Sequence, residues 1–256
     1  MDTPENSPPH TGPSNDQSPA PPPSKPKGKL IMAATCLGHM DDIPRRSLDL
    51  LRNAGDKDLL VFEEDKLARK FLKAAGVHKP YARFSEHGQS ETLSSVSKTL
   101  KKGGTVVYMS DQGTPGLGDP GRDLVQRALD IGAEMSTIPG PSSITAAISL
   151  CPFDCRQFTY LGFLPRQAIK RTEVLKKAAQ YEHPVIILDA PYRILQLLEA
   201  TSRSFGPSRR AFLARDISGP LEAFWVGPLS KLRMESERLW EEEKEKVNFV
   251  LIVDGR

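Results

Sequence analysis

The strongest constraint on the fold is a glycine- and proline-rich stretch that separates an apolar run from a helical pattern. Residues 109–121 read Met-Ser-Asp-Gln-Gly-Thr-Pro-Gly-Leu-Gly-Asp-Pro-Gly, between the apolar run Thr105–Tyr108 and the helical pattern Arg122–Ile131. Glycine and proline impose backbone angles that let a loop approach a ligand closely. Asp119 before Pro120 is typical of a helix N-cap and first helical position. The stretch therefore predicts a strand, a shaped loop and a helix start.

The same order of apolar run, polar loop and helical pattern recurs through the N-terminal half. Such alternation predicts βα units around a largely parallel sheet. A second shaped loop, Pro139-Gly140-Pro141-Ser142-Ser143, follows the last of these runs. We expect an N-terminal α/β domain over residues 29–151, with strands at 30–35, 58–63, 81–84, 105–110 and 135–138.

The pattern changes after Cys151. Two apolar runs, 211–217 and 221–226, follow one another without a helix between them, which indicates a mixed, partly antiparallel sheet. We expect a C-terminal α/β domain over residues 152–256, with the other strands at 157–164, 185–189 and 247–253. The predicted fold class is thus two α/β domains, the first with a largely parallel sheet and the second with a mixed one.

Residues 1–28 are predicted to be a disordered, proline-rich tail. Nine prolines and almost no aliphatic residues lie between Met1 and Lys29, so the segment cannot bury enough surface to offset the entropy of ordering. It also lacks the cationic start and apolar core of a signal peptide. Because no apolar run is long enough to cross a bilayer, we expect a cytoplasmic protein without a membrane partner.

The cysteines and the net charge exclude few classes of function. Cys36, Cys151 and Cys155 lack the paired spacing of a zinc site, and we expect no metal. Buried thiols in a reducing cytoplasm are the favoured interpretation, although Cys151 and Cys155 could in principle form a cross-link. A net charge of +3 permits a nucleic-acid partner through a local patch but does not argue for one.

Neither shaped loop is a standard nucleotide-binding motif. The P-loop pattern is absent, and in Gly116-x-Gly118-x-x-Gly121 the proline at 120 distorts the strand-to-helix context of a dinucleotide site. One such loop could be a structural turn. Two of them at the ends of successive strands of one sheet favour a ligand site.

Three segments resemble the signature loops of the tetrapyrrole methylase superfamily, the class III S-adenosylmethionine (SAM)-dependent methyltransferases. They are Ser110–Pro115, Gly118–Gly121 and Ile138–Ser143. Within the superfamily the chain is most similar to the small-subunit ribosomal RNA cytidine 2′-O-methyltransferases. Gly162-Phe163-Leu164-Pro165 and Pro191-Tyr192-Arg193 support this branch.

The resemblance implies a homodimer that binds SAM in a cleft between its two α/β domains. It implies cofactor contacts at Asp111, Gly113, Thr114, Pro115, Ser142, Ser143, Phe163 and Ala190. Several polar positions differ from the usual pattern of the family, including His39, Gln112, Gly118 and Ser218. SAM binding is therefore better supported than the identity of the methyl acceptor.

The implied chemistry is in-line methyl transfer to a ribose hydroxyl, which requires alignment and removal of a proton. Candidate bases are Asp119, Glu64 and His87, the last beside Glu86. Each has another interpretation: Asp119 could only cap its helix, Glu64 could be an exposed strand end, and His87 could lie in a solvated loop.

An RNA substrate requires positive charge near the cleft. Arg166 and Arg171 belong to a basic helical segment, and Arg193 follows the next strand, so these three are the predicted substrate-binding residues. A basic helix is also commonly a solvated face.

Three functions stay open from the sequence. The leading hypothesis is a SAM-dependent methyltransferase that acts on the ribose 2′-hydroxyl of small-subunit ribosomal RNA. The second is a methyltransferase of the same superfamily with a small-molecule substrate such as a tetrapyrrole, against which the basic helix argues mildly. The third is a non-catalytic SAM-binding paralogue.

Overall fold

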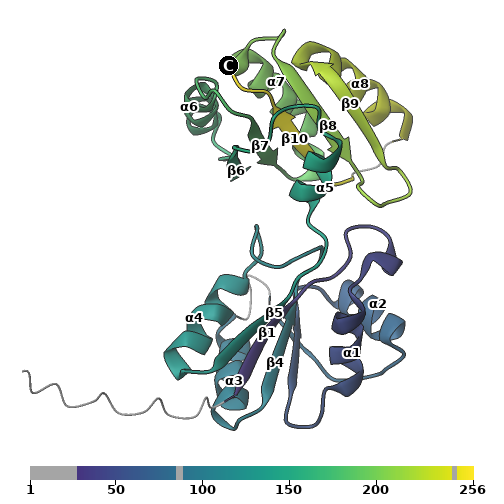
Figure 1. Cartoon of the computed structure of the whole chain (residues 1–256), viewed down its shortest axis with the longest axis vertical. Helices are drawn as coiled ribbons and strands as arrows, with labels where there is room; N and C mark the ends of the chain where they lie inside the picture. Colours follow the sequence, from purple (N-terminus) through teal and green to yellow (C-terminus); the bar gives the residue numbers. More distant parts are fainter. Residues whose placement is uncertain (1–27, 85–88, 244–246) are drawn as a thin grey trace, which may run out of the picture.

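The computed structural model describes residues 28–84, 89–243 and 247–256. These residues form two five-stranded sheets, each packed against helices (Figure 1). Sheet A, in the N-terminal half, lies at the bottom of Figure 1, and sheet B, in the C-terminal half, lies at the top. A parallel sheet followed by a mixed sheet confirms the predicted fold class.

Sheet A has the strand order β3-β2-β4-β1-β5, and its pairings are parallel. Its strands are β1 (Lys29–Ala33), β2 (Leu59–Phe62), β3 (Ala82–Arg83), β4 (Thr105–Met109) and β5 (Glu134–Ile138). The intervening helices are η1 (Met40–Asp42), α1 (Arg45–Asn53), α2 (Asp65–Ala75), α3 (Gln89–Lys101) and α4 (Gly121–Ile131).

Helices cover both faces of sheet A, because side chains alternate across a strand. In β4, Val107 packs with α1 and α2, whereas Val106 and Tyr108 pack with α3 and α4. Strand β1 leads to α1 and its neighbour β4 leads to α4, so the chain leaves these two strands toward opposite faces. Open parallel sheets bind ligands at such a switch point, beyond the carboxyl ends of the strands.

Sheet B has the strand order β6-β7-β10-β8-β9. Strands β6 and β7 are parallel, and the other neighbours are antiparallel. Helices α6, α7 and α8 cover one face through Leu175, Leu198 and Leu232. The elements are β6 (Thr159–Phe163), α6 (Ala168–Ala178), β7 (Val185–Leu188), η2 (Pro191–Arg193), α7 (Ile194–Phe205), β8 (Arg210–Arg215), β9 (Ala223–Pro228), α8 (Leu229–Glu243) and β10 (Phe249–Val253).

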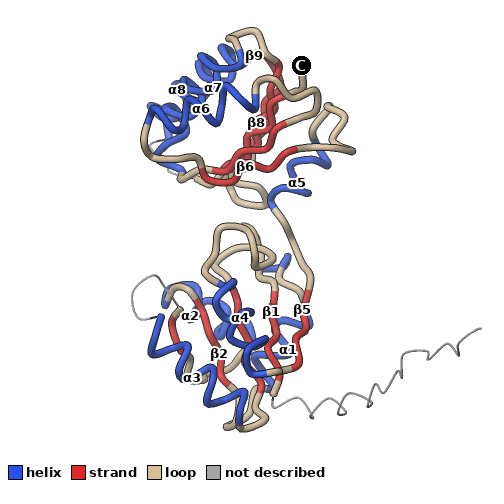
Figure 2. Tube along the Cα trace, turned by 90° about the vertical axis from the view of Figure 1, so that its left-hand side faces the viewer, coloured by secondary structure: helices blue, strands red, loops and turns tan. Residues whose placement is uncertain are grey.

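Helix α5 (Ser143–Leu150) covers the other face of sheet B. Its buried residues Ile144 and Ala147 pack with Ile186 and Phe212, and Figures 1 and 2 show the helix next to that sheet. The boundary predicted from the sequence comes after α5, at residue 151. Packing instead groups α5 with sheet B, so we propose a division of the chain just before Ser143.

None of the helices in the described part of the chain is both long and apolar enough to span a bilayer.

Candidate functional site

A cavity of about 420 Å³ lies between the loops of sheet A and the strand ends of sheet B. Its volume lies in the range of small-molecule sites. The residues from the first half of the chain that line the cavity include Leu37, Glu63, Ser110, Asp111, Gln112, Gly113, Thr114, Gly118 and Asp119. Ser142 and Ser143, at the start of α5, join Phe163, Leu188, Asp189, Asp216, Ile217, Asn248 and Val250 on the other side.

Gly113 and Thr114 join the two glycine- and proline-rich loops. The Gly113 N–H donates to the Cys36 carbonyl at 3.0 Å, and the Thr114 N–H donates to the Pro141 carbonyl at 2.8 Å. Thr114 Oγ1 also donates to the Gly140 carbonyl at 3.0 Å. At Gly113, φ is +68° and a Cβ would lie 2.8 Å from the Pro141 oxygen, so only glycine fits.

Asp119 organises the end of the loop that follows β4. Its Oδ1 accepts a hydrogen bond from the Gly121 N–H at 2.9 Å, and its Oδ2 accepts one from the Gly116 N–H. Helix α4 begins at Gly121 with Pro120 as its N-cap, one residue later than the sequence predicts. Asp119 lines the cavity, but both of its carboxylate oxygens are bonded to backbone N–H groups.

Three carboxyl groups, Glu63, Asp111 and Asp119, gather on the sheet A side of the cavity. Tyr108 is fully buried, and its Oη donates to Glu63 Oε1 at 2.5 Å. Burial raises the pKa of Glu63 to about 7; the hydrogen bond from Tyr108 opposes this rise, and Asp111 and Asp119 add to it. Burial, with the nearby charge of Glu64, raises the pKa of Asp111 to about 6. A bound cation would stabilise the ionised forms.

Polar contacts connect the loops of sheet A to those of sheet B. Asn248 Nδ2 donates to Gln112 Oε1 at 2.5 Å, beside the cavity. Ser218 Oγ accepts a hydrogen bond from the His39 N–H at 3.1 Å and donates to Asp42. These contacts hold the two halves of the cavity in register.

Phe163 covers the cavity at the end of β6. Its ring lies against Gly118, where φ is +85° and a Cβ would lie 2.8 Å from the ring. The Phe163 side chain is nevertheless 54% exposed. Phe163 and Gly118 therefore meet at the mouth of the cavity, one from each half of the chain.

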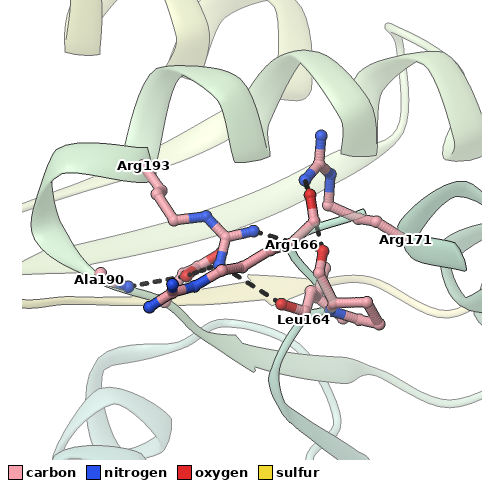
Figure 3. A network of polar contacts seen from close by, with 7 residues as sticks. Leu164, Arg166, Arg171, Ala190 and Arg193 are labelled. Atoms are coloured by element: carbon pink, nitrogen blue, oxygen red, sulfur yellow. Dashed lines mark hydrogen bonds and ion pairs between the residues drawn. The ribbon is translucent and has the colours of Figure 1, made fainter. Parts of the chain in front are cut away.

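The three arginines predicted to bind substrate have different environments (Figure 3). Arg171 is buried and donates from Nη1 to the Arg166 carbonyl at 3.1 Å. Arg193 lies 2.9 Å from Asp189, whose side chain is 1% exposed, and 3.4 Å from the Leu164 carbonyl. The side chain of Arg166 is exposed. Arg171 and Arg193 thus hold the segment that follows β6, and Arg166 faces solvent.

The cavity brings together most of the predicted cofactor residues. Asp111, Gly113, Thr114, Ser142, Ser143 and Phe163 line it, whereas Pro115 and Ala190 are adjacent in sequence to lining residues. Among the predicted bases, Asp119 lines the cavity and Glu64 is exposed outside it. His87 lies outside the described residues.

Sequence reasoning missed several polar residues of the cavity. Glu63, Ser110, Gln112, Asp216 and Asn248 all line it, and none was among the predicted site residues. Each directly follows or precedes a strand in the sequence, or belongs to the loop after β4. Proximity to a strand end was the available signal, but it does not show which neighbouring residue points inward.

Comparison with known proteins identifies relatives along most of the chain. The family model described as tetrapyrrole (corrin/porphyrin) methylases matches residues 29–233. The chain is 29% identical over 229 residues to "Ribosomal RNA small subunit methyltransferase I" of Thermotoga maritima, with 90% of this chain and 99% of that protein covered. The protein of the same name from Pseudomonas aeruginosa is 33% identical over 205 residues, which cover 80% of this chain and 72% of that protein.

Solved structures share the fold at lower identity. A uroporphyrin-III C-methyltransferase from Thermus thermophilus matches with a TM-score of 0.58 at 16% identity, and the match covers 89% of this chain and 94% of that one. A cobalt precorrin-4 methyltransferase matches with a TM-score of 0.63 at 13% identity, and the match covers 93% and 98%.

Proposed function

The chain belongs to the tetrapyrrole methylase family, and on this basis we propose that it transfers a methyl group from SAM to a ribose 2′-hydroxyl of small-subunit ribosomal RNA. It is a methyltransferase by family. The observation that carries the proposal is the match, over most of the chain, to relatives named ribosomal RNA small subunit methyltransferase I.

The charge of the cavity supports SAM as the methyl donor. SAM carries a positive sulfonium and a positive ammonium group. Five carboxylate side chains, Glu63, Asp111, Asp119, Asp189 and Asp216, line the cavity. Among the described residues of the lining, none is Lys, Arg or His. A cation in this environment is stabilised by the surrounding negative charge.

The shape of the cavity supports the same ligand. Gly113 and Thr114 bring the joined loops to the cavity, and their N–H groups are bonded to the Cys36 and Pro141 carbonyls. Ser142 and Ser143 add small hydroxyls to the lining. On the opposite side, Leu188 and Val250 belong to strands of sheet B and provide apolar surface for a base. Apolar surface combined with polar groups that fix the orientation of the ligand is typical of small-molecule sites.

An RNA acceptor would contact the outside of the cavity. Arg166, Lys170, Lys176 and Lys177 are exposed on and before α6, which follows β6 and Phe163. Phosphates bind to such exposed cations. A ribosomal substrate also agrees with the cytoplasmic location expected from the sequence.

We further propose a homodimer. Strand β9 is an edge strand of sheet B, and it exposes Phe224 and Val226. An exposed apolar edge favours association with a second chain. Sedimentation equilibrium of the full chain tests this state, and a monomer at micromolar concentration would refute it.

Methyl transfer from labelled SAM to small ribosomal subunits tests the proposed function. The subunits come from a strain that lacks this gene, and subunits from the parent strain are the control because their site is already methylated. We expect label only in the former, at a ribose. Calorimetry with SAM on the same preparation separates the two parts of the proposal: unlabelled subunits with intact SAM binding refute the ribosomal acceptor, and absent SAM binding refutes the cofactor.

A further inference from the structure

We propose that Glu63 is the catalytic base that takes the proton from the acceptor hydroxyl during methyl transfer. This inference rests on the proposed function, because it assumes SAM as the donor and a hydroxyl as the acceptor. Glu63 takes the place of the candidate bases suggested by the sequence. It is the neighbour of one of them, Glu64, but it lines the cavity, whereas Glu64 is exposed.

The register of sheet A brings Glu63 to the cavity. Strands β2 and β4 are parallel neighbours in which Phe62 lies opposite Met109. Glu63 and Ser110 therefore leave the sheet together at its carboxyl edge, and both line the cavity. Glu64, one residue later, is exposed and serves as the N-cap residue of α2.

Two hydrogen bonds orient the Glu63 carboxyl group. Tyr108 Oη donates to Oε1 at 2.5 Å, and the Asp111 N–H approaches Oε2 at 3.4 Å. Since the hydroxyl of a buried tyrosine requires a partner, Tyr108 holds Oε1 in place. Because the contact at Oε2 is long, Oε2 is the oxygen that can take a proton from a ligand.

The other carboxylates of the cavity are held in place by loop N–H groups or by an arginine. Both oxygens of Asp119 accept hydrogen bonds from loop N–H groups. Asp189 forms an ion pair with Arg193, and Asp216 Oδ2 accepts a hydrogen bond from the Leu221 N–H at 2.7 Å. Asp111 lines the cavity together with Glu63, and we assign it the role of binding the cofactor.

The step balances with the groups that the proposed reaction supplies. A bond forms between the acceptor oxygen and the methyl carbon, and the bond from that carbon to the sulfonium sulfur breaks. The acceptor O–H proton passes to Glu63 Oε2, and the sulfur becomes a neutral thioether. The titratable groups that face Glu63 are Tyr108, Asp111 and Asp119. Together with burial they hold its pKa at about 7, which suits a base that works near neutral pH.

The test compares wild type with Glu63→Gln and Tyr108→Phe, with Glu91→Gln as the matched control on the exposed face of α3. Methyl transfer to undermethylated small subunits is measured from pH 5.5 to 9, and SAM binding is measured by calorimetry. At saturating SAM we expect Glu63→Gln to lower kcat by about 100-fold or more. SAM binding should weaken as well, because one of the five carboxylates that line the cavity loses its charge. Tyr108→Phe should move the acidic limb of the profile to higher pH, because the hydrogen bond from Tyr108 lowers the pKa of Glu63.

A second readout does not depend on the acceptor. Carboxyl ¹³C NMR of the full chain, with Glu63 assigned by its loss in Glu63→Gln, should show a midpoint near pH 7. A midpoint below 5, or wild-type kcat in Glu63→Gln, overturns the role of Glu63. If the wild type itself labels no ribosomal subunit, the ribosomal acceptor is wrong, and the NMR midpoint then decides whether Glu63 keeps the role of base for another hydroxyl.

Discussion

Asn248 Nδ2 donates to Gln112 Oε1 at 2.5 Å and thereby connects the start of β10 to the loop after β4. Gln112 Nε2 in turn donates to the Leu37 carbonyl at 2.9 Å. Three segments that are far apart in the sequence thus meet at one side chain on the rim of the cavity. A ligand that contacts both halves depends on this alignment.

Loss of this bridge should weaken ligand binding. Asn248→Ala removes a hydrogen bond worth about 0.5–1.5 kcal/mol, so we expect S-adenosylhomocysteine to bind roughly 2- to 12-fold more weakly. Calorimetry on Asn248→Ala, Gln112→Ala and the double variant measures the effect. Because the two side chains share one bond, the double variant should lose less than the sum of the single losses. Fully additive losses would show that the two residues act separately.

A side chain at Gly118 should displace Phe163. In Gly118→Ala the methyl group would lie 2.8 Å from the ring, and the positive φ adds strain of about 1–2 kcal/mol. Gly116→Ala is the matched control, because φ is +126° there but a Cβ has no neighbour within 4 Å. We expect both variants to lose thermal stability, and Gly118→Ala alone to change ligand affinity. Adding Phe163→Ala should restore the part of the affinity that is lost to the clash.

The buried pair of Arg193 and Asp189 should be important for stability. Removing one partner of a buried ion pair typically costs about 3–5 kcal/mol, so Arg193→Ala should lower the melting temperature strongly. Arg203→Ala is the control, because the Arg203 side chain is 79% exposed in its pair with Glu199 and such pairs are worth about 0–1 kcal/mol. Equal melting temperatures in the two variants would show that Arg193 does not support the fold.

The raised pKa values predict opposite effects of pH on the free protein and on SAM binding. Glu63 and Asp111 have folded-state pKa values of about 7 and 6, above their ordinary values of 4.5 and 3.8. Their contribution to stability is fully present below pH 3.8 and is lost as the pH rises through 6 and 7. SAM should bind more tightly over the same rise, because its cation stabilises the ionised carboxylates.

Thermal shifts from pH 5 to 8, with and without SAM, measure both effects. Glu63→Gln should flatten the pH dependence of the free protein relative to wild type. S-adenosylhomocysteine lacks the sulfonium charge, so its affinity should rise less with pH than that of SAM. A steeper rise for S-adenosylhomocysteine would contradict the electrostatic explanation.

Local patterns in the sequence predicted most elements of the fold. Gly76 and Gly132 end α2 and α4 in the left-handed conformation, which glycine adopts without strain. The central position of β10, between β7 and β8, and the packing of α5 on sheet B were not predictable in this way. Both depend on which apolar faces meet across the chain, and a run of apolar residues does not specify its partner.

The candidate site was likewise predictable only where local patterns in the sequence determine it. The two shaped loops were found because glycine and proline mark unusual backbone, and the structure joins them through Thr114. Glu63 was missed in favour of Glu64, since the sequence does not reveal where β2 ends to within one residue. The burial of Arg171 was also hidden, because an arginine that holds backbone carbonyls looks the same in sequence as one that faces RNA.

The carboxylate lining also has a consequence for the choice among adenosine compounds. In a cell, ATP and ADP contain the same adenosine as SAM and compete for sites that recognise adenosine. The cavity lining in the described part of the chain presents carboxylates such as Asp111 and Glu63 and no cationic side chain. A triphosphate would meet repulsion where a sulfonium meets attraction. In the proposed SAM site, the same negative charge would therefore disfavour ATP and ADP relative to SAM.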